Sequence, residues 1–153
     1  MLFRSDEAAA ELRKVLELDP GFLLAHVYVI FTNVSQGRPE EALEAARKLM
    51  TVATASPIPT GMLAYALAVA GQPGEARKVL DQLLELHRQR YVPAPQFFFV
   101  YWGLNDTETA LDWLEKACEE RALNLPILIR DPLSEQFRSL PRFQDIRRRM
   151  GLS

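Results

Sequence analysis

The sequence predicts an all-α protein built as an α-solenoid, that is, a stack of helix–turn–helix hairpins. Three observations lead to this fold class. Alanine recurs every 34 residues, glycine or asparagine recurs at the same interval, and apolar residues between these markers follow three- and four-residue steps. A fixed period of this length is typical of repeat architectures, in which each hairpin buries its core against its neighbours. We expect three full hairpins, a preceding half repeat and a C-terminal helical cap.

The alanines of the period are expected where the two helices of a hairpin cross. They are Ala8, Ala42, Ala76 and Ala110, each 34 residues after the one before. A small side chain lets two helices approach closely, and a larger one would overpack the crossing by roughly 1–3 kcal/mol. These four positions should therefore be buried between helices.

A residue that tolerates a left-handed backbone predicts the turn of each hairpin. Gly37, Gly71 and Asn105 are also 34 residues apart, and glycine, followed by asparagine, adopts that conformation most easily. Each turn thus separates a first helix from a second helix. The repeat units run over 23–56, 57–90 and 91–124.

The second helix of each unit has the spacing of a helix with one buried face. In the middle unit, apolar residues recur at Ala76, Val79, Leu80, Leu83 and Leu84, in the three- and four-residue steps of an amphipathic helix. Equivalent positions repeat the pattern in the other units. One expected buried row is Leu12, Ala46, Leu80 and Leu114, and another is Val15, Leu49, Leu83 and Ala117.

The two ends of the chain depart from the period. Few residues precede Ala8, so 5–20 is predicted as a half repeat, a second helix without its partner. Its unmet face includes Ala9 and Leu16, which predicts self-association; the alternative is that the helix is an ordinary cap. After Asn124 the period is lost and prolines punctuate two short helices, predicted as a cap over 125–153. The whole chain, 1–153, then forms a single domain.

The chain resembles the tetratricopeptide repeat family over about residues 6–124. The residues that carry the resemblance are Glu41-Ala42-Leu43, residues 71–76, Ala110-Leu111 with Leu114 and Ala117, and Glu17-Leu18-Asp19-Pro20. The resemblance implies a non-catalytic scaffold for protein–protein interaction. The first helices depart from the family pattern: His26, Thr60 and Ala94 stand where it has tryptophan. Residues 110–152 are similar to the terminal repeats of large bacterial signalling proteins, which implies an upstream catalytic or DNA-binding region in a parent chain.

The resemblance also implies a concave peptide-binding groove lined by the first helices. In the repeats that the chain resembles, the groove positions correspond to Leu24, Val27, Phe31, Ile58, Tyr65, Val92 and Phe99. We expect half-exposed aromatic rings there, which would bind an apolar or amphipathic segment of a partner protein or of the parent chain. The alternative is that the rings pack between neighbouring repeats, or beneath the C-terminal tail. A second functional hypothesis is assembly of copies through the unpaired N-terminal helix.

Composition and motifs argue against other classes of function. The net charge is −2, which provides no basic field for nucleic acid or an anionic membrane. No catalytic, phosphate-binding or metal-binding motif is present, so we expect no enzyme activity, no cofactor and no metal. Cys118 is the single cysteine and is interpreted as a small apolar residue, while His87 is interpreted as a helix-end residue. With no disulfide, signal peptide or membrane span, a cytoplasmic location is expected.

Overall fold

The computed structural model describes residues 6–19, 22–53, 56–120 and 139–149, and it is α-helical with no strand in these ranges. Eight helices lie in the described part of the chain. They are α1 (Asp6–Leu18), α2 (Leu23–Ser35), α3 (Pro39–Val52), α4 (Ile58–Val69), α5 (Pro73–Gln89), α6 (Ala94–Gly103), α7 (Thr107–Glu119) and α9 (Pro141–Arg149).

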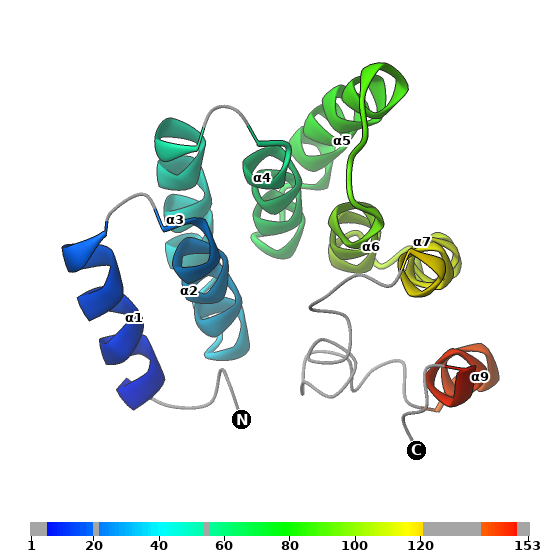
Figure 1. Ribbon diagram of the computed structural model, residues 1–153, viewed down its shortest axis with the longest axis horizontal. Coiled ribbons are helices and arrows are strands. Elements are labelled where there is room, and N and C mark those ends of the chain that lie inside the picture. Colours follow the sequence, from blue (N-terminus) through cyan, green and yellow to red (C-terminus); the bar gives the residue numbers. More distant parts are fainter. Residues whose placement is uncertain (1–5, 20–21, 54–55, 121–138, 150–153) are drawn as a thin grey trace.

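The helices stack as successive antiparallel hairpins along a curved row (Figure 1). The hairpins are α2 with α3, α4 with α5, and α6 with α7. The first helix of the middle hairpin, α4, also packs on α3 and on α6. The all-α solenoid predicted from the period is thereby confirmed. Each hairpin lies within one predicted unit, although the unit boundaries themselves remain predictions.

The three hairpin turns have the left-handed backbone that their residues predict. The φ angles are +73° at Gly37, +82° at Gly71 and +62° at Asn105. In each turn the residue that follows the left-handed one donates its N–H to the carbonyl of the residue five positions earlier, as Arg38 does to Asn33 at 2.8 Å. This bond occupies a carbonyl that the helix end would leave without a partner. Proline, which lacks an N–H, then begins α3 and α5.

The buried positions of the period form the contact between helices. Ala42, Ala76 and Ala110 are completely buried, as expected at a close crossing; the side chain of Ala8 lies outside the described part of the structure. The predicted rows are buried in the second helices of all three hairpins, at Ala46, Leu49, Leu80, Leu83, Leu114 and Ala117. In α1, Leu12 and Val15 are only half-buried.

The first helices α4 and α6 are more deeply enclosed than the second helices. In α6 every residue from Ala94 to Val100 is buried, including the polar Gln96. A helix that is apolar on all sides is stable only when neighbours cover it all round. The bulky residues of α6, which depart from the family pattern, thus make this helix part of the core.

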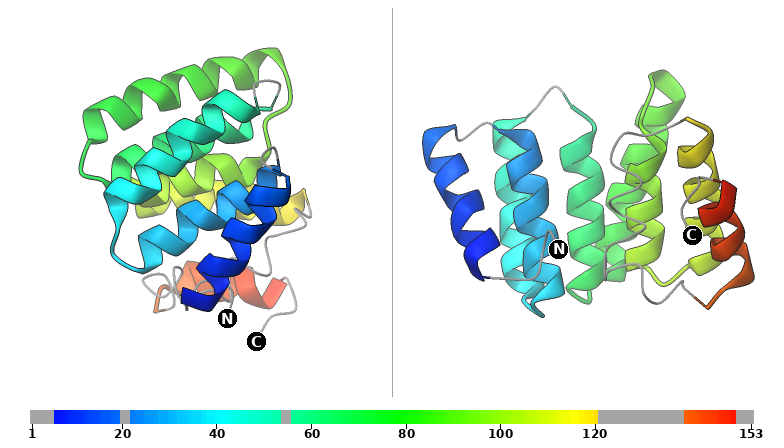
Figure 2. Two further views of the ribbon diagram at one scale, coloured as in Figure 1. Left: turned by 90° about the vertical axis from the view of Figure 1, so that its left-hand side faces the viewer. Right: turned by 60° about the horizontal axis from the view of Figure 1, so that its bottom comes forward.

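The C-terminal helix α9 docks on α7 through both apolar and charged contacts. Phe143 and Ile146 of α9 are buried. Figure 2 shows α9 against the last hairpin. Arg142 of α9 donates from Nε to Glu115 Oε1 at 2.9 Å and also pairs with Glu108 and Asp112 of α7. The other short helix predicted for the cap lies outside the described residues.

Candidate protein-binding surface

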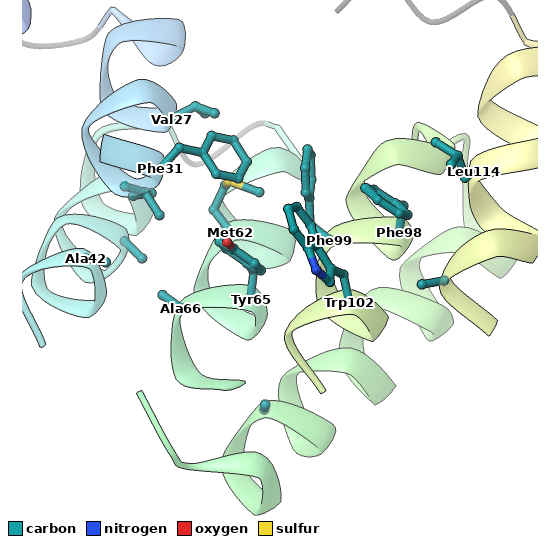
Figure 3. Packing of buried hydrophobic residues seen from close by; sticks show 14 of the residues in the cluster. Val27, Phe31, Ala42, Met62, Tyr65, Ala66, Phe98, Phe99, Trp102 and Leu114 are labelled. Atoms are coloured by element: carbon teal, nitrogen blue, oxygen red, sulfur yellow. The ribbon is translucent and has the colours of Figure 1, made fainter. Parts of the chain in front are cut away.

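The aromatic residues Phe31, Tyr65 and Phe99 form one cluster, which we call the aromatic ladder. They come from α2, α4 and α6, and Figure 3 shows their rings converging. The ring centroids are 5.5 Å apart for Phe31 and Tyr65, 5.9 Å for Tyr65 and Phe99, and 4.8 Å for Phe31 and Phe99. Trp102 extends the cluster, with its ring 6.2 Å from that of Tyr65. These separations are typical of stabilising aromatic pairs.

The rings of the ladder are buried, so the expectation that they are half-exposed is wrong. Phe31 and Tyr65 are each 2% exposed and Phe99 is 1% exposed. The rings pack between neighbouring repeats, which is the alternative arrangement that the sequence left open. The ladder therefore belongs to the hydrophobic core, together with Met62 and Ala66.

Two glycines explain how α4 and α6 come close enough to bury the ladder. A Cβ atom on Gly61 of α4 would lie 2.5 Å from Gln96 Oε1 of α6. A Cβ atom on Gly103 of α6 would lie 3.0 Å from Ala68 Cβ and 3.2 Å from Tyr65 Cδ1. Because neither glycine carries that atom, the two helices approach at both ends of their contact. Their rings then meet each other instead of solvent.

The other predicted groove residues offer little apolar surface. Val92 is buried, Val27 is nearly so, and Ile58 is half-buried. The side chain of Leu24 lies outside the described part of the structure. Binding of a peptide by these residues remains a prediction, and a ligand would have to reach them past the packed rings.

The exposed large apolar residues lie elsewhere, along one edge of the solenoid. Within the described ranges they are Leu18, Phe22, Met50, Val52 and Tyr91. Leu18 and Val52 end α1 and α3, Phe22 immediately precedes α2, and Tyr91 lies between α5 and α6. The connections from second helices to following first helices share one side of the array (Figure 1). We call these five residues the apolar edge.

The sequence itself marks the apolar edge, through large aromatic residues that lie between the predicted helices. Phe22 and Tyr91 flank helices, outside the three- and four-residue steps that define the buried faces. Tyr91 is 65% exposed, and its hydroxyl donates to Glu120 Oε1 at 3.3 Å. Partial desolvation and the Glu120 carboxylate raise the pKa of Tyr91. Glu120 also accepts the Ala94 N–H at 3.2 Å, which ties the edge to the start of α6.

The two histidines and the cysteine, which are the side chains considered for catalysis, are buried or packed against other side chains. His87 lies in the last turn of α5, where its ring meets Phe97 and Trp113 edge-on at 5.2 and 5.8 Å. Cys118 is half-buried against the core, and His26 is buried in α2. Among the residues that the structure describes, no three His, Cys, Asp or Glu side chains gather as a metal site would require.

The arginines near the C-terminus are engaged with acidic residues. Arg148 and Arg149 lie 3.6 and 3.1 Å from Asp145 carboxylate oxygens, and Arg149 also lies 3.5 Å from Glu115. Because these arginines are paired with carboxylates, they do not form a row of positive charge that could bind phosphates. Separately, none of the described helices has the length and apolarity needed to span a membrane.

The comparisons with known proteins identify the repeat. Residues 33–93 match the family described as tetratricopeptide repeat. This segment runs from the end of α2 to the residue before α6 and includes both glycine turns. No curated protein and no solved structure matches the chain. Tetratricopeptide repeats generally mediate protein–protein interactions. The family match over residues 33–93, the 34-residue period and the stacked hairpins together support tetratricopeptide repeats as the repeating unit of this chain.

Proposed function

We propose that this protein is a non-catalytic module that binds an apolar or amphipathic segment of a partner protein at the apolar edge. The observation that carries the proposal is that the exposed large apolar residues all lie at or near the connections between repeats, on one side of the array, from α1 to the residues before α6. Exposed apolar side chains that gather on one face of a protein are typical of interaction sites. The aromatic ladder supports this role by holding the first helices in a fixed arrangement.

The chemistry of the edge favours an amphipathic ligand. Phe22 and Tyr91 offer aromatic side chains, which are enriched among the residues that dominate binding energy. Tyr91 and Glu120 also provide polar atoms beside the apolar ones. A helix with spaced apolar anchors would cover the apolar residues, and its polar face would remain in water.

Selection of peptides from a displayed library tests this proposal. Peptides selected on the wild-type protein should bind the double variant Phe22→Glu/Met50→Glu at least tenfold more weakly, a total loss of at least about 1.4 kcal/mol of binding free energy. Fluorescence anisotropy of labelled peptides measures the affinity. The control is Gln72→Glu, which adds negative charge at the opposite edge, before α5. Equal binding to the wild type and the double variant would refute the apolar edge as the binding surface.

The larger context is part of the same proposal. The similarity of 110–152 to terminal repeats of bacterial signalling proteins supports a regulatory role within a cytoplasmic signalling protein. In that role, the bound segment belongs to a partner or to an upstream domain of the same parent chain. Measuring whether a covalently linked upstream domain competes with selected peptides distinguishes the two sources.

A second candidate function is assembly of copies through α1. The observation that favours it is the 89% exposure of Leu18 at the end of this helix. Repeats bury their cores against neighbours, so an uncovered α1 face favours association with another copy. Sedimentation at rising concentration should then show dimers, and Leu18→Glu should restore the monomer. A monomer at all concentrations would eliminate this function without affecting the first proposal.

A further inference from the structure

A cavity of about 180 Å³ lies where α1, α2 and α3 meet. It is lined by Arg13, Val29, Thr32, Asn33, Gln36, Arg38 and Glu41. The α2 residues belong to the C-terminal half of that helix, whereas Phe22 of the apolar edge precedes its first turn. None of the lining residues belongs to the ladder or to the apolar edge. Its volume is similar to that of cavities that accept a ring of six carbon atoms, about 150 Å³.

Two oxygen atoms beside this cavity are buried without a hydrogen-bond partner. They are Thr32 Oγ1 and Gln36 Oε1, and Thr32 as a whole is 2% exposed. Buried polar groups in folded proteins are nearly always paired, so each exception requires an explanation. Both residues line the cavity. A ligand in the cavity that offers a hydrogen-bond donor would supply the missing partner.

The charged side chains around the cavity favour a monoanion. Arg13 makes no ion pair with any described residue, and Arg38 approaches Glu41 only at 3.9 Å. Two guanidinium groups thus face one carboxylate. Guanidinium binds a carboxylate through two parallel hydrogen bonds. Glu41 and the two oxygen acceptors would repel a dianion such as phosphate.

We infer that this cavity binds an amino-acid-like group, meaning a carboxylate with an N–H donor close to it. Arg13 pairs with the carboxylate, and the N–H donates to both Thr32 Oγ1 and Gln36 Oε1, the two buried atoms without a partner. Val29 contacts the aliphatic part of the ligand. Such binding requires that rotation about the Cα–Cβ bond of Thr32 turn its hydroxyl into the cavity, and that the Gln36 amide reorient its Oε1 in the same way. The chemistry is shared by a free amino acid and by the end of a peptide chain.

Binding of defined probes to the full chain tests this inference. The probes are L-glutamate, Gly-Gly-Ser-Glu with a free C-terminus, the same peptide amidated at both carboxyl groups, and inorganic phosphate. Calorimetry should show saturable binding of glutamate or of the free peptide, and amide resonances of Asn33 and Gln36 should shift. Glutamate alone assigns the cavity to a free amino acid, and the peptide alone assigns it to a chain end. Absence of binding by both, or equal binding of the amidated peptide or of phosphate, overturns the inference.

Variants separate the cavity from nonspecific charge effects. Arg13→Gln should weaken binding at least tenfold, and its control Lys14→Gln, the same change at the next residue of α1, should leave it unchanged. Thr32→Val should weaken binding and also raise the unfolding midpoint, because it removes a buried hydroxyl that has no partner. Equal effects of Arg13→Gln and Lys14→Gln, or undiminished binding by Thr32→Val, overturn the inference. None of these residues belongs to the apolar edge, so failure here leaves the proposed function intact.

Discussion

Phe31 and Phe99 lie two repeats apart, yet their ring centroids are separated by only 4.8 Å. This distance is shorter than the distance from either ring to Tyr65, which belongs to the repeat between them. A simple solenoid has contacts only between adjacent repeats. Here the first and third hairpins also contact each other directly. Their stabilities should therefore be coupled.

We predict that Phe31 and Phe99 are coupled energetically. Each change to alanine should destabilise the protein by about 3–5 kcal/mol, because it leaves a cavity in the core. The double variant should lose about 0.5–1.5 kcal/mol less than the sum, because the pair interaction is removed only once. Urea unfolding of the four proteins measures this difference. Strict additivity would mean that the two rings do not stabilise each other.

The same substitution at two tyrosines should destabilise the protein strongly at one position and hardly at all at the other. Tyr65→Gln should destabilise by about 3–5 kcal/mol, since it replaces a buried ring with a polar amide. Tyr91→Gln, at an exposed edge position, should change stability by no more than about 0.5 kcal/mol. Thermal and urea unfolding measure both values. Similar small effects would place Tyr65 on the surface and restore the open groove predicted from the sequence.

Glycine should be required at Gly61 but not at Gly74. Gly61→Leu should destabilise by about 1–3 kcal/mol or more, because its Cβ would collide with Gln96 and separate α4 from α6. Gly74 has no atom within 4 Å of a Cβ built on it. Gly74→Leu should therefore be neutral or stabilise α5 by up to about 1 kcal/mol through helix propensity. Chemical denaturation of both variants measures these changes. Equal stability of the two variants would contradict the close approach of α4 and α6 at Gly61.

Docking of α9 should weaken at acidic pH. The hydrogen bond from Arg142 is the main cause that lowers the pKa of Glu115 below its ordinary value of 4.5. A lowered folded-state pKa means that the ionised form stabilises docking above pH 4.5. This contribution is lost as the pH falls from 4.5 through the folded-state pKa. Amide exchange of α9, measured on both sides of pH 4.5, should show earlier loss of protection than in the hairpins.

The matched variants for this cap are Arg142→Gln and Arg148→Gln. Arg142→Gln should weaken α9 docking by about 1 kcal/mol and remove the acid-dependent step. Among the described residues Arg148 forms an ion pair only with the exposed Asp145, at 3.6 Å, so its variant should keep that step. An unchanged pH profile in Arg142→Gln would show that the buried Phe143 and Ile146 hold the helix without the ion pairs.

The sequence by itself determined the repeating elements of this protein. The alanines of the period, the left-handed turns at Gly37, Gly71 and Asn105, and the apolar steps of the second helices all act through local geometry or through contact with the next helix. Such signals are readable because helix spacing is regular. They predicted the all-α solenoid and the buried faces of α3, α5 and α7.

The tertiary structure decided which surfaces remain open. A groove position in α2, α4 or α6 is exposed only if neighbouring first helices stay apart, and Gly61 and Gly103 bring α4 and α6 together. The ladder is buried for this reason, while Phe22 and Tyr91, which lie between helices, remain exposed. The Arg142 contacts join α9 to α7 across a stretch without the 34-residue phase. Contacts between side chains distant in the sequence depend on how the hairpins pack, and a period along the chain carries no record of that packing.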